Sequence, residues 1–117
     1  MSLMNYADYY NNVETPLGFQ EWLHTKEIDA VVGFGNLGYD CPYTNFLKES
    51  GYSEAVVGYG GIFLENESMP VPDWLKTFMS YIDDIFDQEV ITAQDALDTI
   101  HHKEVFLIVT DSIRKKV

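Results

Sequence analysis

The chain contains 117 residues, of which 19 are acidic and 7 are basic, and its formal net charge at pH 7 is −12. This length predicts a single domain, and the 46% hydrophobic content, with 8 Tyr, 7 Phe and 2 Trp, indicates a folded chain rather than a disordered one. A lone cysteine excludes a disulfide scaffold, and no apolar run approaches the roughly 20 residues of a membrane span. The acidic balance argues against a broad phosphate-binding face.

The ends of the chain differ in composition from its body. Two methionines stand three residues apart in Met1-Ser2-Leu3-Met4, so we interpret residues 1–3 as an expression leader and residues 4–117 as one domain. Residues 1–102 hold 17 acidic and 3 basic side chains, whereas residues 103–117 hold 2 acidic and 4 basic ones. No secretion signal is visible, and the single cysteine fits a reducing compartment, so we expect a cytoplasmic protein.

The first part of the chain shows two helical patterns before a strand. Aromatic residues at helical spacing predict a helix over 4–12. Thr15 as the N-cap and Pro16 in the first helical position predict a second helix that ends near Thr25. The apolar, β-branched run 29–34 predicts a buried strand.

The middle of the chain predicts a helix followed by a β-hairpin. Asp40 is the N-cap candidate of this helix, Pro42 lies in its first turn, and Gly51 ends it. The hairpin of residues 54–65 turns through Gly-Tyr-Gly-Gly, whose glycines can adopt the positive φ of a tight turn.

The last part of the chain contains the longest periodic segment, which predicts a helix over 73–87. Thr92 and Asp95 have the spacing of a capping box at the start of a helix over 93–101. The run 105–109 predicts a central strand, with a helix as the open alternative. Together these elements predict an α+β fold, with a small mixed sheet of three to four strands, including the hairpin, and four to five helices packed on it.

A glycine-rich segment follows the first predicted strand. Residues 33–38 read Gly-Phe-Gly-Asn-Leu-Gly and match the G-x-G-x-x-G pattern of dinucleotide-binding loops. Asp40 and Pro42 place the next helix beyond the last glycine, so its amides would not meet a pyrophosphate, and we expect no cofactor. A smaller ligand remains a hypothesis, and its candidate residues are Gly33, Gly35, Gly38, Tyr39, Tyr43 and Tyr59.

Cys41 stands at the start of a predicted helix, in the sequence Cys41-Pro42-Tyr43-Thr44. This segment resembles the Cys-Pro-Tyr-Cys or Cys-Pro-Tyr-Ser site of glutaredoxins, and the resemblance implies a reactive thiol whose pKa the helix N-terminus lowers. Thr44 stands where a resolving cysteine would be, and Asp40 places a carboxylate beside the thiol. The alternative is a small side chain packed in the core. His24 is the candidate base of a Cys–His pair.

The remaining polar clusters predict surface rather than chemistry. Asp98 and His102 have the i, i+4 spacing of two metal ligands, but the sequence offers no third ligand and we predict no metal site. Acidic residues lie on and just after the polar side of the longest helix, and they indicate either a solvated face or a surface that meets a basic partner. They are Asp83, Asp84, Asp87 and Glu89.

The sequence shows no acid, base and nucleophile set with a recognisable spacing. We therefore expect a non-enzymatic protein-interaction or regulatory domain that forms a homodimer or binds a basic protein, and that binds neither nucleic acid nor membrane. The alternatives are a thiol-dependent redox protein centred on Cys41 and a small-ligand binder that uses the loop from Gly33 to Gly38.

Overall fold

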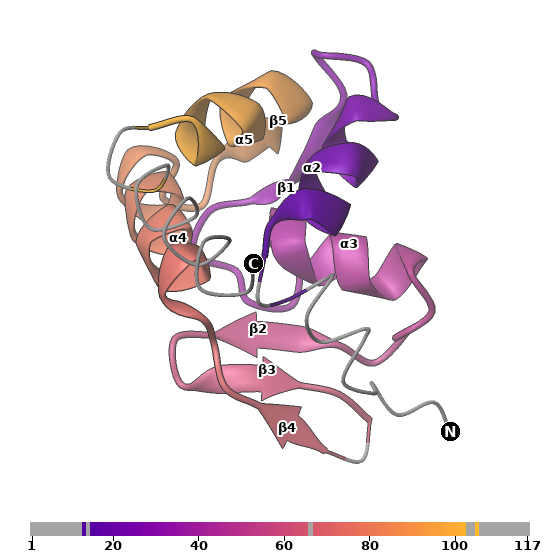
Figure 1. Ribbon diagram of the computed structural model, residues 1–117. Helices are drawn as coiled ribbons and strands as arrows, with labels where there is room; N and C mark the ends of the chain where they lie inside the picture. Colours follow the sequence, from indigo (N-terminus) through magenta and orange to yellow (C-terminus); the bar gives the residue numbers. More distant parts are fainter. Residues whose placement is uncertain (1–12, 14, 66, 103–104, 106–117) are drawn as a thin grey trace, which may run out of the picture.

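The computed structural model describes residue 13 and residues 15–65, 67–102 and 105 (Figure 1). Helices and strands are both present in this part of the chain, which confirms the α+β composition. The predicted helix 4–12 and the leader 1–3 lie outside the described residues. The described elements are, in order, α2 (Leu17–His24), β1 (Val31–Phe34), α3 (Pro42–Glu49), β2 (Val56–Gly58), β3 (Gly61–Phe63), β4 (Ser68–Met69), α4 (Asp73–Ile85), β5 (Val90–Thr92) and α5 (Ala93–Ile100).

In the part of the chain that the structure describes, the strands form two small antiparallel sheets rather than one, so the prediction of one mixed sheet was wrong. β1 pairs with β5, and β2, β3 and β4 form a second sheet in that order. Figure 1 shows the three-stranded sheet at the bottom of the molecule and the two-stranded sheet above it. Helix α3 contacts both β1 and β2 and therefore separates the strands that a single sheet would have to join.

Two helices begin one residue later than the sequence predicted. Pro16 rather than Thr15 is the N-cap of α2, and Cys41 rather than Asp40 is the N-cap of α3. Pro42 consequently occupies the first helical position of α3, where its missing N–H removes no hydrogen bond from the helix.

Two other helix ends confirm their predictions. Gly51, with a φ of 112°, ends α3, and the N–H of Tyr52 donates to the carbonyl of Leu47 over 3.0 Å. At the start of α5, the Thr92 hydroxyl accepts from the Asp95 N–H (3.1 Å), and the Asp95 carboxylate accepts from the Thr92 N–H (3.0 Å). This reciprocal pair is the predicted capping box.

The hairpin of β2 and β3 is present, but its connection is shorter than predicted. Gly58 pairs with Gly61, so only Tyr59 and Gly60 join the strands. None of the residues 58–61 has a positive φ, so the expectation that these glycines adopt a positive φ in the turn was wrong. A two-residue connection can also turn with negative φ at both central residues.

A cluster of aromatic rings forms the centre of the core. The ring of Phe19 lies 5.1 to 6.3 Å, between centroids, from five other aromatic rings. Helix α4 contributes two of them through its apolar stripe, as its periodicity predicted. The one polar atom of the Trp74 ring is satisfied, because Nε1–H donates to the Val13 carbonyl over 2.7 Å. The five rings around Phe19 are Trp22, Tyr43, Phe46, Trp74 and Phe78.

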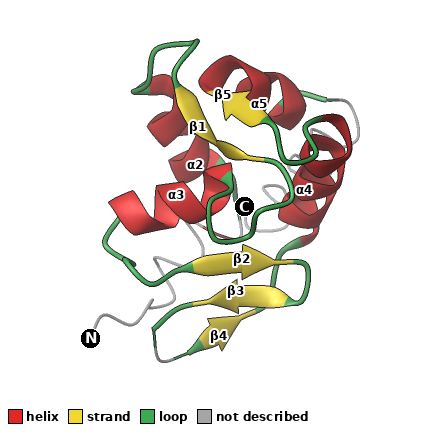
Figure 2. Ribbon diagram, turned by 180° about the vertical axis from the view of Figure 1, so that it is seen from behind, coloured by secondary structure: helices red, strands yellow, loops and turns green. Residues whose placement is uncertain are grey.

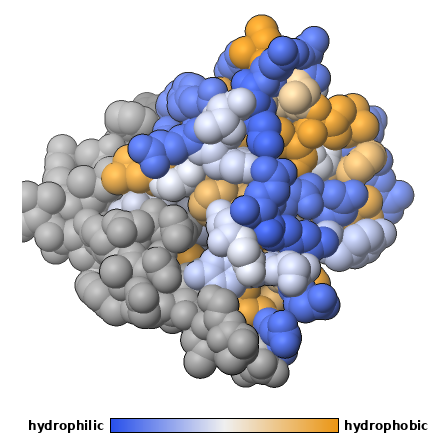
Figure 3. Space-filling view, turned by 90° about the vertical axis from the view of Figure 1, so that its right-hand side faces the viewer, coloured by the Kyte–Doolittle hydropathy of each residue, from blue (hydrophilic) through white to orange (hydrophobic). Residues whose placement is uncertain are grey.

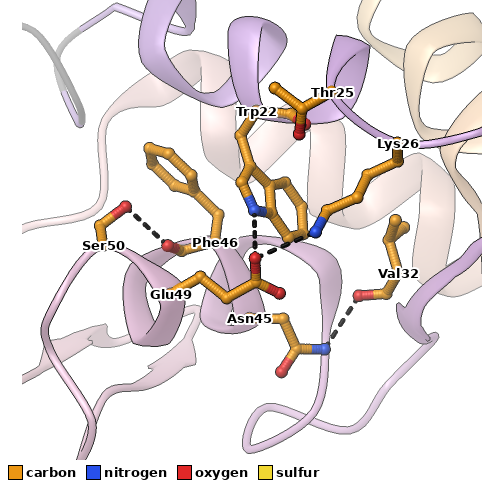
Figure 4. Close-up of polar contacts among 8 residues, drawn as sticks. All are labelled: Trp22, Thr25, Lys26, Val32, Asn45, Phe46, Glu49 and Ser50. Carbon is orange, nitrogen blue, oxygen red and sulfur yellow. Dashed lines mark hydrogen bonds and ion pairs between the residues drawn. The ribbon is translucent and has the colours of Figure 1, made fainter.

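Polar contacts at the surface join α2 to α3 (Figure 4). Trp22 Nε1–H and Lys26 Nζ donate to the same oxygen of Glu49, over 2.9 and 3.0 Å. These two hydrogen bonds, together with the charge of Lys26, hold the pKa of Glu49 below its ordinary value. One turn earlier on α3, Asn45 Nδ2 donates to the Val32 carbonyl over 2.9 Å. Helix α3 is therefore anchored to both α2 and β1.

Most of the C-terminal segment lies outside the described residues. Of the run 105–109, only Val105 is described; it is buried and has helical backbone geometry, which was the alternative to the predicted strand. Among the described helices the longest, α4, has 13 residues, and none has the length and apolar composition needed to cross a membrane.

Candidate functional site

A partly enclosed cavity of about 160 Å³ lies where four segments meet. These segments are the loop after β1, the start of α3, the end of β2 and the middle of α4, and Figure 2 shows them around the centre of the molecule. Most of the cavity wall is apolar, whereas Asn36, Tyr59 and Asp83 supply polar groups. The apolar wall includes Leu37, Tyr43, Val57, Phe78, Met79 and Ile82.

A hydrogen-bond network at the edge of this cavity centres on Asp83 of α4. Its Oδ2 accepts from the Tyr59 hydroxyl over 2.8 Å, and its Oδ1 accepts from the backbone N–H of Asn36 over 2.8 Å. The Nδ2 of Asn36 also donates over 2.7 Å to Oδ1 of Asp87, which lies two residues beyond the end of α4. The carboxylate of Asp83 on α4 and that of Asp87 just after the helix are thus held by donors from two other segments.

The conformation of Asn36 makes this network possible. Its φ is 61°, in the left-handed region that asparagine adopts more readily than most residues. In this conformation the backbone N–H of Asn36 reaches the carboxylate of Asp83 on α4, and its side-chain amide reaches that of Asp87 just beyond the helix.

Tyr59 lies in the connection between β2 and β3, and about half of its side chain is exposed. Partial burial of the hydroxyl, its hydrogen bond to Asp83 and the nearby negative charge together raise the pKa of Tyr59 far above its ordinary value. Tyr59 is therefore a neutral hydrogen-bond donor across the physiological pH range.

On its outer side, the Asp83 network faces a shallow depression lined by acidic and hydroxyl groups. Among the described residues, no Lys or Arg forms an ion pair with these acids. The ion pair between described residues joins Lys26 to Glu49, away from this depression. We call this surface the acidic face and define it by Asn36, Tyr59, Asp83, Asp84 and Asp87.

Cys41 lines the cavity but does not have the environment of a reactive thiol. Its side chain is only 6% exposed, and burial raises the pKa of the thiol despite hydrogen bonds that act in the opposite direction. The Thr44 hydroxyl donates its single hydrogen to the Gly38 carbonyl, so in the 3.1 Å contact between Cys41 and Thr44 the thiol is the donor. The described contacts of the Cys41 sulfur do not include His24, which lies exposed in the last turn of α2.

The three glycines of the 33–38 loop allow other parts of the chain to pack closely against it. A Cβ on Gly35 would collide with the carbonyl oxygen of Phe86, and a Cβ on Gly38 would lie 2.5 Å from the carbonyl oxygen of Val57. A Cβ on Gly33 would lie 2.6 Å from the nitrogen of Pro42. Protein backbone therefore fills the space beside each glycine, and of the three only Gly38 lines the cavity.

The other predicted residues lie in different environments. Tyr43 is fully buried and forms part of the cavity wall, whereas Tyr39 is exposed and lies outside the cavity. Asp98 of α5 accepts a hydrogen bond from Gln94, and the ring of His102, which follows α5, lies 4.2 Å between centroids from the ring of Tyr81. Among the described residues, no group of three His, Cys, Asp or Glu side chains has an arrangement that holds a metal ion.

Sequence reasoning placed Asp83 on a solvated face and missed its position at a cavity. A signal was available, because Asp83 follows Met79 by four residues and therefore lies beside the apolar stripe of α4. Asn36 was read only as part of the glycine pattern, although asparagine between glycines is typical of a left-handed backbone.

Comparisons with known protein families, with curated proteins and with solved structures found no match.

Proposed function

We propose that this protein is a non-enzymatic interaction domain that binds a basic protein partner through the acidic face. The observation that carries this proposal is the network in which Asn36 and Tyr59 hold Asp83 and Asp87 from outside α4. Carboxylates that are already oriented lose less side-chain freedom when a partner binds, so more of the interaction energy appears as affinity.

The charge distribution supports a partner that supplies the positive charge. The last turn of α4 contains no basic residue, and the described lysines form no ion pair with the acidic face. The chain as a whole carries a net charge of −12, which attracts a basic protein over a distance and disfavours an acidic one.

The state of Cys41 supports binding rather than catalysis. A nucleophilic cysteine needs an accessible thiolate, whereas Cys41 is buried, has a raised pKa and donates its hydrogen to Thr44. The redox alternative would therefore require a different conformation around the start of α3.

Binding of a fluorescent oligolysine peptide, followed by anisotropy, tests the proposal. The double variant Asp84→Asn/Asp87→Asn loses two exposed charges, and at about 0.5 to 1 kcal/mol each we expect a loss of affinity of roughly five- to thirtyfold. Glu54→Gln removes an acid from the loop before β2, outside the acidic face, and serves as the control. Equal affinities of the double variant and the wild type, or equal binding of an oligoglutamate peptide, would overturn the proposal.

A second copy of this chain is the alternative partner. Val31 and Val90 lie on one face of the β1–β5 sheet and are 56% and 50% exposed. On the side of the molecule shown in Figure 3, hydrophobic residues gather beside a strongly hydrophilic area. Sedimentation analysis tests this alternative: a dimer that Val90→Lys dissociates supports it, and a wild-type monomer at high concentration excludes it.

A further inference from the structure

We propose that the cavity beside Asp83 binds a primary ammonium group carried on a short apolar tail. The ammonium group lies against the Asp83 carboxylate, and the tail occupies the space between α4 and β2. This inference rests on the proposed function, since both assign the recognition of a positive charge to Asp83, but it adds a ligand class and a second compartment of the site.

The size and lining of the cavity define the tail. A cavity of about 150 Å³ lined by aliphatic and aromatic side chains is large enough for benzene. The cavity here measures about 160 Å³, and its wall includes Val57, Phe78, Met79 and Ile82. One aromatic ring or a branched chain of similar volume therefore fits, whereas a larger apolar group would have to extend past Tyr59.

The Asp83 carboxylate defines the charge of the head group. From the described residues, Oδ2 of Asp83 accepts one hydrogen bond from Tyr59 and Oδ1 accepts one from Asn36, and a carboxylate oxygen has two lone pairs. One lone pair on each oxygen thus remains for a ligand, and an ammonium group offers three donors. Among the described residues, no Lys or Arg lines the cavity, so a carboxylate ligand would meet Asp83 without a counter-charge.

The position of Asp83 links the cavity to the acidic face. Asp83, Asn36 and Tyr59 line both the cavity and the shallow depression outside it. A ligand with its tail inside and its ammonium group at Asp83 therefore points its remaining atoms toward the surface on which we place the partner. The same chemistry is available from a free arylalkylamine and from the N-terminal residue of a protein chain, if that residue is hydrophobic.

The two methionines of the described region provide a direct readout in solution. Met79 lines the cavity, whereas Met69 belongs to β4 and does not. In protein with ¹³C-labelled methionine methyl groups, we expect 2-phenylethylamine to shift the Met79 signal saturably and to leave Met69 unchanged. The neutral 2-phenylethanol and the anionic 3-phenylpropionate have the same ring and a similar length, and we expect each to bind at least about tenfold more weakly.

Two variants separate the head group from the tail. Asp83→Asn keeps the size of the side chain and removes its charge, so we expect affinity for the amine to fall about tenfold or more, toward that for the alcohol. Leu37→Trp adds volume to a partly exposed side chain of the cavity wall and is expected to abolish the shift of Met79. If Asp83→Asn does not fold, the comparison of amine, alcohol and acid on the wild type decides the same question.

The source of the amine is tested with the peptide Phe-Gly-Gly. A shift of Met79 with the free N-terminus that is lost on acetylation assigns the site to a protein N-terminus, whereas a response to 2-phenylethylamine alone assigns it to a free amine. Equal affinity for amine and alcohol, or no response of Met79 to any probe, overturns the inference. Either result leaves the oligolysine test of the acidic face unaffected, because that test depends on Asp84 and Asp87.

Discussion

The substitution Gly35→Ala tests whether the 33–38 loop is built for packing rather than for a ligand. A Cβ at this position would collide with the Phe86 carbonyl oxygen, so the loop and the end of α4 would have to move apart. That movement breaks two backbone hydrogen bonds, from the Gly35 N–H to the Glu89 carbonyl (3.1 Å) and from the Gln88 N–H to the Gly35 carbonyl (2.9 Å). At about 1 to 2 kcal/mol for each bond lost at a buried residue, we expect the free energy of unfolding to fall by about 2 to 4 kcal/mol.

Urea unfolding followed by tryptophan fluorescence measures this change, because Trp74 is fully buried and reports on the core. Gly60→Ala is the matched control, since a Cβ there meets nothing within 4 Å and the φ of Gly60 is not positive. We expect this control to change stability by less than about 1 kcal/mol, in the stabilising direction if at all. If the free energy of unfolding of Gly35→Ala falls by less than about 0.5 kcal/mol, the space beside Gly35 is not filled by the chain. That result would refute the packing argument and leave room for a ligand at the loop.

Three further predictions concern the capping box, the thiol and the tyrosine. Thr92→Ala removes the side-chain acceptor of the Asp95 N–H and is expected to lower the free energy of unfolding by about 1 kcal/mol in thermal denaturation; an unchanged stability would contradict the cap. Alkylation of Cys41 by iodoacetamide at mildly alkaline pH is expected to be about tenfold or more slower than that of a free thiol until urea unfolds the chain, whereas equal rates would show an exposed thiolate. Because folding raises the pKa of Tyr59, its contribution to stability is present below about pH 10, where an unfolded tyrosine begins to ionise, and is lost as the pH rises further. Stability measured against pH should therefore fall less steeply above this value in Tyr59→Phe, and identical slopes would contradict the Asp83 hydrogen bond.

Local signals were sufficient to locate the helices and the hairpin but not to pair the strands. The apolar stripe of α4 and the capping box of α5 depend on residues three or four apart, so the sequence reveals them directly. β5 was missed because three residues that lead into a helix show no alternation, and β4 has only two residues. The pairing of Val31 with Thr92 joins positions so far apart that no local pattern predicts it.

The candidate site could be predicted only in part, for the same reason. Tyr43, Tyr59 and Cys41 were identified individually, and the cavity does bring them together. Their relation to Asp83 depends on how α4 packs against the hairpin and the loop, which are separate segments in sequence. The glycine pattern does not by itself indicate a ligand, because close approach of the chain to itself requires glycine as much as close approach of a phosphate does.

The left-handed Asn36 has a consequence for the motions of this region. Its hydrogen bonds to Asp83 of α4 and to Asp87 just beyond that helix, together with the hydrogen bond of Tyr59, mean that the loop, the hairpin connection and the end of α4 share one small set of contacts. Separation of any one of these segments breaks a hydrogen bond of the same network, so we expect the brief openings of the three segments to be coupled. The amide of Asn36, whose hydrogen bond to Asp83 closes the network, is therefore the position at which hydrogen exchange reports how often the cavity opens.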